Sequence, residues 1–289
     1  MGLSNVDAGN VFLATVDAPA DDPTQEVTNE LAVCTLPLAD PATCIRRLRE
    51  HGSAPKLIVT DEDSAPALAR ILAETAIFIE PMAAVVTVNL PRLATRLLAG
   101  IASSEAQASG VANAVVLADA GANFLLSEVL VSSVKRLDDP VPSLVQTARS
   151  MFPGGQFVIT SGVESGVGDV STRHLPEGFS LLACCGANGL PAWMSQQLDA
   201  TASEAMLSRL PAWDGVTLFG NVQWAEFVSW NVAVVRMWSS HARNRSFDAC
   251  HWCSQPLVRD VCAFCGYDPQ HSAQGAPAEP VAASQGGQQ

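Results

Sequence analysis

Short apolar runs recur along the first 220 residues, and amphipathic stretches separate them. The runs are rich in β-branched residues and predict buried strands at 11–16, 31–36, 56–60, 76–80, 83–89, 114–118, 156–160, 179–183 and 216–219. The stretches between them predict helices at 41–50, 64–74, 91–106, 122–136, 141–151 and 191–210. Strands that alternate with helices indicate an α/β fold, in which helices cover both faces of a mixed or mostly parallel sheet.

The pattern over residues 222–238 fits two kinds of element. Its apolar residues match one face of a helix, and they match the alternation of a strand almost equally well. The chain has four tryptophans between positions 213 and 238, and we expect them to be core or interface anchors. A surface rich in such anchors would also suit a viral or other structural subunit that assembles with copies of itself.

Length and composition favour one large unit followed by a small module. The chain has 289 residues, of which 48% are hydrophobic, enough for a well-filled core. We expect an α/β body over residues 1–240, a zinc-binding module over 246–268 and a disordered tail over 269–289. No apolar run is long enough for a membrane span, and the N-terminus does not resemble a signal peptide, so we expect a cytoplasmic protein.

The most specific motif lies near the C-terminus. Cys250 and Cys253 form one Cys-x-x-Cys pair, and Cys262 and Cys265 form a second pair after an eight-residue spacer. Each pair turns two sulfurs toward one point, and two pairs together supply the four tetrahedral sulfur ligands that Zn²⁺ accepts. We therefore predict a structural zinc site at these four residues. Two disulfides, a redox dithiol and a rubredoxin-like iron centre are the alternatives.

Over about residues 248–268, this sequence resembles the zinc-ribbon family. The resemblance rests on the two Cys-x-x-Cys knuckles and on Gly266, which directly follows the second. The sequence departs from the family pattern in two ways: Ser254 replaces the first glycine, and the spacer is short. We expect a tight hairpin in the spacer, with a turn at Gln255-Pro256.

Charge is distributed unevenly along the chain. The net charge is −13, and residues 1–235 carry all of it, because four arginines balance four acids in residues 236–289. An acidic body repels nucleic acids and anionic membranes. We therefore expect a protein or RNA/DNA partner to bind through Arg243, Arg245 and Arg259 around the zinc site. Alternatively, these arginines clamp the zinc module to the acidic body. An oligomer is compatible with either arrangement.

Three acidic residues follow expected strands and suggest a second hypothesis. Asp17, Asp61 and Asp119 each end an apolar run, and the carboxyl ends of strands line the ligand crevice of an open α/β sheet. Carboxylates gathered there would hold Mg²⁺ for a phosphohydrolase reaction. The simpler interpretation is that these aspartates cap helices and form turns.

The leading prediction for the whole chain is a non-catalytic zinc protein that docks a partner.

Overall fold

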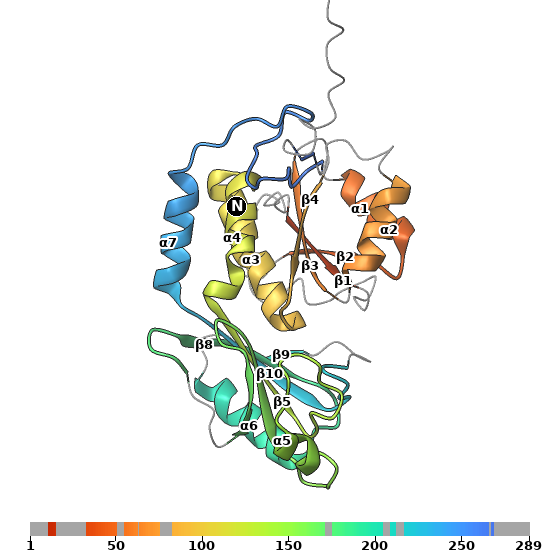
Figure 1. Ribbon diagram of the computed structural model, residues 1–289, viewed down its shortest axis with the longest axis vertical. Helices are drawn as coiled ribbons and strands as arrows, with labels where there is room; N and C mark the ends of the chain where they lie inside the picture. The colour runs from red at the N-terminus through yellow and green to blue at the C-terminus, as the bar shows by residue number, and fades with distance from the viewer. Residues whose placement is uncertain are drawn as a thin grey trace, which may run out of the picture.

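The chain folds around two β-sheets with helices packed on and between them (Figure 1). The computed structural model describes residues 11–15, 33–50, 55–62, 64–75, 83–170, 175–204, 209–211, 217–265 and 267–268. The expected strand at 76–80, the residue Asp17 and the expected tail at 269–289 lie outside the described residues.

The first sheet, sheet A, is parallel and has four strands in the order β2-β1-β3-β4. Its strands are β1 (Val11–Thr15), β2 (Cys34–Pro37), β3 (Lys56–Asp61) and β4 (Ala83–Val88). Phe12 pairs with Cys34 on one side and with Ile58 on the other, which fixes the register of the three strands. Every residue of β1 and β3 is buried, as expected for a parallel sheet covered on both faces.

Helices cover both faces of sheet A. The helices α1 (Pro41–Glu50) and α2 (Ala65–Thr75) lie on one face, where Leu48 and Leu68 pack with Phe12 and Ile58. The helices α3 (Arg92–Ser109) and α4 (Val111–Asp119) lie on the other face. Gly110 joins α3 to α4 with a backbone φ of 97°, a value that a residue with a side chain rarely adopts.

The second sheet, sheet B, has six strands in the order β7-β6-β5-β10-β8-β9 and is antiparallel except at β8–β9. Its strands are β5 (Leu125–Val131), β6 (Phe157–Gly162), β7 (Gly166–Asp169), β8 (Ser180–Gly186), β9 (Arg209–Pro211) and β10 (Trp224–Trp230). The other elements are the 3-10 turn η2 (Gly121–Asn123) and the helices α5 (Leu144–Arg149), α6 (Ala192–Glu204) and α7 (Val232–Arg243). One face of sheet B packs on α6, and the other shares the main core with α3 and α4.

A buried carboxyl side chain links sheet B to helix α3. Glu226 lies in β10, at the centre of sheet B, and is fully buried. Its side chain accepts hydrogen bonds from the backbone N–H groups of Leu93 (3.2 Å) and Ala94 (3.1 Å), in the first turn of α3, and from the Ser127 hydroxyl (3.1 Å). The first N–H groups of a helix have no partner within it, so Glu226 supplies from sheet B the cap that α3 needs.

The structure confirms the α/β class and most of the expected elements. The strand expected at 114–118 is wrong: these five residues are buried within α4. A continuous apolar run does not distinguish a buried strand from a buried helix, because neither shows a polar face. The helix expected at 122–136 is also wrong, since β5 occupies residues 125–131 and all seven are buried.

Two further boundaries differ from expectation. The ambiguous stretch 222–238 contains both element types, because β10 is followed at Asn231 by α7. The helix expected at 191–210 ends at Glu204, and β9 follows at Arg209–Pro211.

Among the helices that the structure describes, none is both long enough and apolar enough to span a bilayer.

Candidate metal centre

The first Cys-x-x-Cys pair lies in a small hairpin. Leu257 N–H donates to the Asp248 carbonyl (2.7 Å), and Cys250 N–H donates to the Gln255 carbonyl (2.8 Å). An antiparallel bridge joins Ala249 to Pro256. The expected turn at Gln255-Pro256 is therefore wrong, because Pro256 pairs with Ala249. The turn of the hairpin is formed by residues 251–253, within the first Cys-x-x-Cys motif.

The four sulfurs converge on one point. The Sγ atoms of Cys250, Cys253, Cys262 and Cys265 all lie within 4.8 Å of one another. The Sγ atoms of Cys250 and Cys265 are 3.7 Å apart, as are those of Cys253 and Cys262, and each contact joins one sulfur from each motif. Sulfurs at the corners of a tetrahedron around zinc, about 2.3 Å from the metal, are about 3.8 Å apart. A disulfide would require about 2.05 Å, so the arrangement fits a four-thiolate metal site and not two disulfides.

Backbone N–H groups help to hold the sulfur ligands. Burial raises the pKa of the Cys250 thiol, but hydrogen bonds from the backbones of Cys253 and Trp252 outweigh it and lower the pKa to about 7. Burial, together with the neighbouring thiols, raises the pKa of Cys265 to about 12. A metal ion that binds all four sulfurs must therefore displace protons, which makes its affinity depend on pH.

Ser254 occupies the position where a zinc knuckle usually carries glycine. Its backbone φ is 60°, in the left-handed region that costs a residue with a Cβ about 1–2 kcal/mol. Its N–H donates to the Cys250 carbonyl (2.9 Å), which closes the turn. Ser254 therefore adopts the left-handed backbone conformation that glycine usually provides at this position.

The knuckle hairpin is fastened to the α/β body. Cys250, Cys262 and Phe264 are buried and belong to the same core cluster as α3 and α4. Arg259, in the spacer, forms a bidentate ion pair with Asp119 in which its Nε lies 2.7 Å from Oδ2. The expectation that Asp119 ends a strand is wrong, since Asp119 is the last residue of α4.

The three arginines expected to bind a partner have different surroundings. Arg243 forms a second bidentate ion pair, with Glu105 of α3, in which both contacts are 2.8 Å. Burial raises the pKa of Glu105, but the bonds from Arg243 and Ser109 outweigh it, so the pKa is lowered overall. Arg245 lies 5.5 Å from the centroid of the Phe247 ring. The contacts of Arg243 and Arg259 are those expected of an intramolecular clamp, and a role in partner binding stays a prediction.

An aromatic side chain remains exposed beside the sulfurs. Trp252, between the first two cysteines, is 75% exposed, and its ring stacks on Tyr267 at 6.5 Å with planes 11° apart. Elsewhere, Trp224 is fully buried, and Trp238 makes an edge contact with His241. The described tryptophans therefore differ: Trp224 is a core anchor, whereas Trp252 faces solvent.

Asp61 and Asp119, the two of the three expected strand-end acids that the structure describes, belong to no second metal site within the described residues. Within the described ranges, the four cysteines are the only group of three or more His, Cys, Asp or Glu side chains close enough to hold a metal ion. Asp61 does end β3, and its Oδ1 accepts a hydrogen bond from Ser64 N–H (2.8 Å), directly before α2. This contact closes a turn before the helix, which is the turn-forming role of the simpler interpretation.

Asp61 also borders a cavity of about 510 Å³ at the carboxyl edge of sheet A. The cavity lies where β3, β4 and the start of α3 meet the segments after β5 and before β10. Its charged lining consists of four acids and two arginines: Asp61, Glu62, Asp138, Asp139, Arg92 and Arg136. Sequence reasoning did not anticipate Arg92 and Arg136 at this site, because one lies at a helix start and the other in a loop, and their meeting depends on the fold.

Comparison with known proteins relates the chain to others through its fold. No family model matches the sequence, and no curated protein matches it. A DegV family protein, Cg2579 from Corynebacterium glutamicum, has a similar structure, with a TM-score of 0.51 and 12% identity over 77% of this chain and 96% of that protein. The dihydroxyacetone kinase operon co-activator DhaQ gives a TM-score of 0.46 and 10% identity over 80% of this chain and 86% of its own. At these identities, the DegV likeness concerns the fold alone.

Proposed function

We propose that this protein is a non-catalytic docking protein in which a structural zinc ion holds the C-terminal knuckles on an α/β body and presents them to a protein partner. The observation that carries the proposal is the convergence of four cysteine sulfurs within 4.8 Å. Four thiolates favour zinc or an iron centre, and zinc is the commonest metal in such sites. Because four protein ligands fill the tetrahedral shell, no position is left for substrate, so the role is structural and not catalytic.

The surroundings of the knuckles favour a protein partner over nucleic acid. Arg243 and Arg259 are engaged by Glu105 and Asp119, which lowers the positive charge available for phosphates. The chain carries a net charge of −13, which repels a polyanion. Trp252 is the most exposed large apolar side chain of the knuckles, and tryptophan is enriched among the residues that dominate binding energy at protein interfaces.

Site-specific photocrosslinking in cells of the source organism tests this proposal. A photoreactive phenylalanine analogue at position 252 is expected to give a discrete protein adduct, which disappears when Cys253→Ser is added, because the knuckle loses its metal. The same analogue at Val222, an exposed apolar position outside the knuckles, is the matched control and is expected to give no such adduct.

The proposal fails if position 252 gives no adduct beyond the Val222 control. Retention of RNA or DNA by the purified wild-type protein at about 50 mM salt, lost in Arg245→Ala, would favour nucleic acid as the partner instead.

The cavity favours a second candidate function, the binding of a small polar molecule. A volume of about 510 Å³ lies within the range of ligand pockets, and the site is at the carboxyl edge of a parallel sheet. In the Mg²⁺ hydrolase version of this candidate, Asp61 is the ligand to test. That version predicts a melting temperature that rises with Mg²⁺ and a phosphoesterase activity lost in Asp61→Asn; a melt unmoved by Mg²⁺ and no turnover would contradict it.

A further inference from the structure

Five large apolar side chains are exposed together around α5. Val141 is 82% exposed, Leu144 90%, Val145 69%, Met151 64% and Phe152 71%. Leu144 and Val145 lie in the first turn of α5, Val141 precedes the helix, and Met151 and Phe152 lie in the turn that follows it. We call these five residues the apolar patch. No residue of α5 itself is buried.

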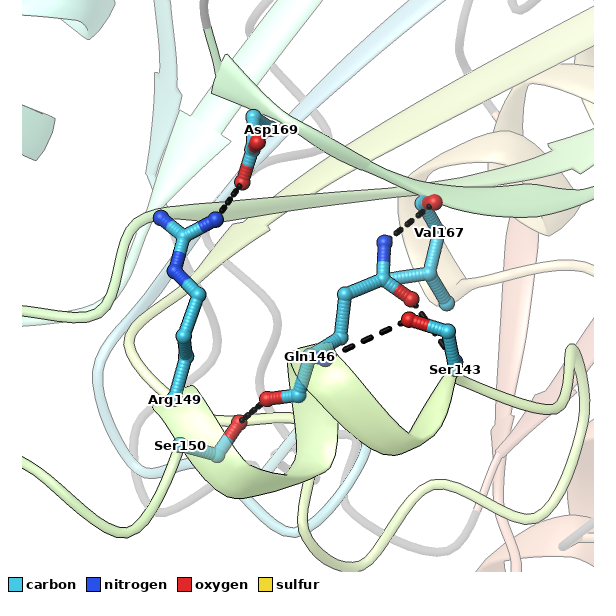
Figure 2. A network of polar contacts seen from close by, with 6 residues as sticks. All are labelled: Ser143, Gln146, Arg149, Ser150, Val167 and Asp169. Carbon is cyan, nitrogen blue, oxygen red and sulfur yellow. Dashed lines mark hydrogen bonds and ion pairs between the residues drawn. The ribbon is translucent and has the colours of Figure 1, made fainter.

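The polar side of this segment, and not its apolar side, faces the protein. Figure 2 shows that Gln146 donates from Nε2 to the Val167 carbonyl (2.8 Å) and that Arg149 pairs with Asp169 (2.8 Å), which fastens α5 to the edge strand β7. Ser150 Oγ accepts from Val134 N–H (3.0 Å), and Ser143 forms a reciprocal capping box with Gln146. These bonds fix the rotation of α5 about its axis, so the apolar patch is held toward solvent.

An arrangement of this kind is costly unless something covers it. Burial of one such side chain stabilises a protein by roughly 1.5–3 kcal/mol. In the monomer, the five side chains of the apolar patch do not gain this stabilisation. The largest apolar patch on a typical monomer is about 300–600 Å² and often has a function. Five side chains that are each at least 64% exposed reach the upper part of that range.

Local charge indicates what covers the apolar patch. Residues 141–155 contain one charged side chain, Arg149, and Asp169 neutralises it. Amphipathic helices that lie on membranes carry several Lys or Arg residues on their polar face, and this segment has none besides Arg149. Two copies of a −13 chain repel each other over most of their surface, but the uncharged apolar patch lets them approach.

We propose that the apolar patch is a self-association surface through which two copies of this chain form a two-fold symmetric dimer. A two-fold axis places the same patch on both copies, so the contact is self-complementary. If each copy contributes about 600 Å², the interface buries about 1,200 Å², the lower limit for specific interfaces. The dimer therefore forms in a concentration-dependent way. This proposal is independent of the metal centre.

Sedimentation velocity over a series of protein concentrations tests the proposal. Wild type is expected to shift from the monomer mass of 30.3 kDa toward twice that value as concentration rises. Leu144→Asp and, separately, Phe152→Asp are expected to stay monomeric with an unchanged circular dichroism spectrum, because both side chains point to solvent in the monomer. Met237→Asp, at a 57% exposed position on α7, is the matched control and is expected to dimerise as wild type does.

Three results would overturn the proposal. The first is a wild type that stays monomeric at the highest attainable concentration. The second is a dimer that persists in both Leu144→Asp and Phe152→Asp. The third is flotation of a monomeric wild type with phosphatidylcholine or phosphatidylserine vesicles, lost in Leu144→Asp, which would assign the apolar patch to a lipid surface instead.

Discussion

Replacing Glu226 by glutamine is expected to remove a specific pH dependence of stability. Burial raises the pKa of Glu226 to about 7 from its ordinary value of 4.5, although bonds from the Ala94 and Leu93 N–H groups and from Ser127 oppose the shift. The folded protein therefore holds the proton more tightly than the unfolded chain does. The stabilisation from this group is fully present below about pH 4.5 and is lost as the pH rises through 7.

The size of the effect follows from the shift. One pKa unit corresponds to about 1.4 kcal/mol, so a shift from 4.5 to about 7 corresponds to about 3 kcal/mol between the two ends of the pH window. Glutamine has nearly the same shape and does not titrate. The free energy of unfolding of wild type, minus that of Glu226→Gln, should therefore fall by about 3 kcal/mol from pH 4.5 to pH 7.5.

Urea denaturation at half-unit pH steps measures this difference. Other titrating groups, including the cysteines of the metal centre, contribute to both proteins and cancel. Glu164→Gln, at an exposed position in the β6–β7 turn, is the matched control, and its stability curve should run parallel to that of wild type. If the curve of Glu226→Gln also runs parallel to wild type across this window, the assigned role of burial at Glu226 is wrong.

Three more substitutions follow from backbone strain and from the clamp. Ser254→Gly should slow zinc release to a chelator and stabilise the knuckle by about 1 kcal/mol, because φ is 60° there; no gain over serine would contradict the strain. Asp119→Asn should cost about 0.5–1 kcal/mol and speed proteolysis within the knuckles, since Arg259 loses a partly exposed ion pair; unchanged proteolysis would show that the clamp is negligible. Gly162→Ala should lower the unfolding free energy by at least about 2 kcal/mol, because φ is 105° and the new Cβ would overlap a backbone carbonyl of β5, whereas Gly166→Ala has room and should be tolerated.

How far the sequence predicts this protein depends on how local each feature is. The cysteine cluster could be predicted because each Cys-x-x-Cys pair sets its own geometry over four residues. The ion pair of Arg259 with Asp119 joins residues 140 positions apart, and no local pattern indicates which acid an exposed arginine will meet. The 510 Å³ cavity is lined by four separate stretches of the chain, so no local pattern indicates it either.

Hydrophobic periodicity did not predict the element type where an element is buried on all sides, because such an element has no polar face to set the period. Residues 114–118 are apolar because α4 lies in the main core, so its helical period is not visible in the sequence. In β5, Ser127 and Glu128 interrupt the apolar run as a polar face would, yet both are buried. The segment 141–151 was correctly expected to contain a helix, and an amphipathic helix of a globular protein ordinarily turns its apolar side toward the core. The bonds of Gln146 and Arg149 to β7 reverse that orientation.

Metal analysis of the purified protein, combined with intact mass spectrometry, tests the central claim most directly. We predict one zinc ion per chain, four reduced cysteines at the metal centre, and loss of the zinc in Cys265→Ser, since removing one thiolate opens a closed four-ligand shell. Cys184→Ser, at a buried cysteine of β8 outside the cluster, is the matched control and should keep its zinc. A wild type that carries no metal and contains two disulfides among Cys250, Cys253, Cys262 and Cys265 would contradict the account.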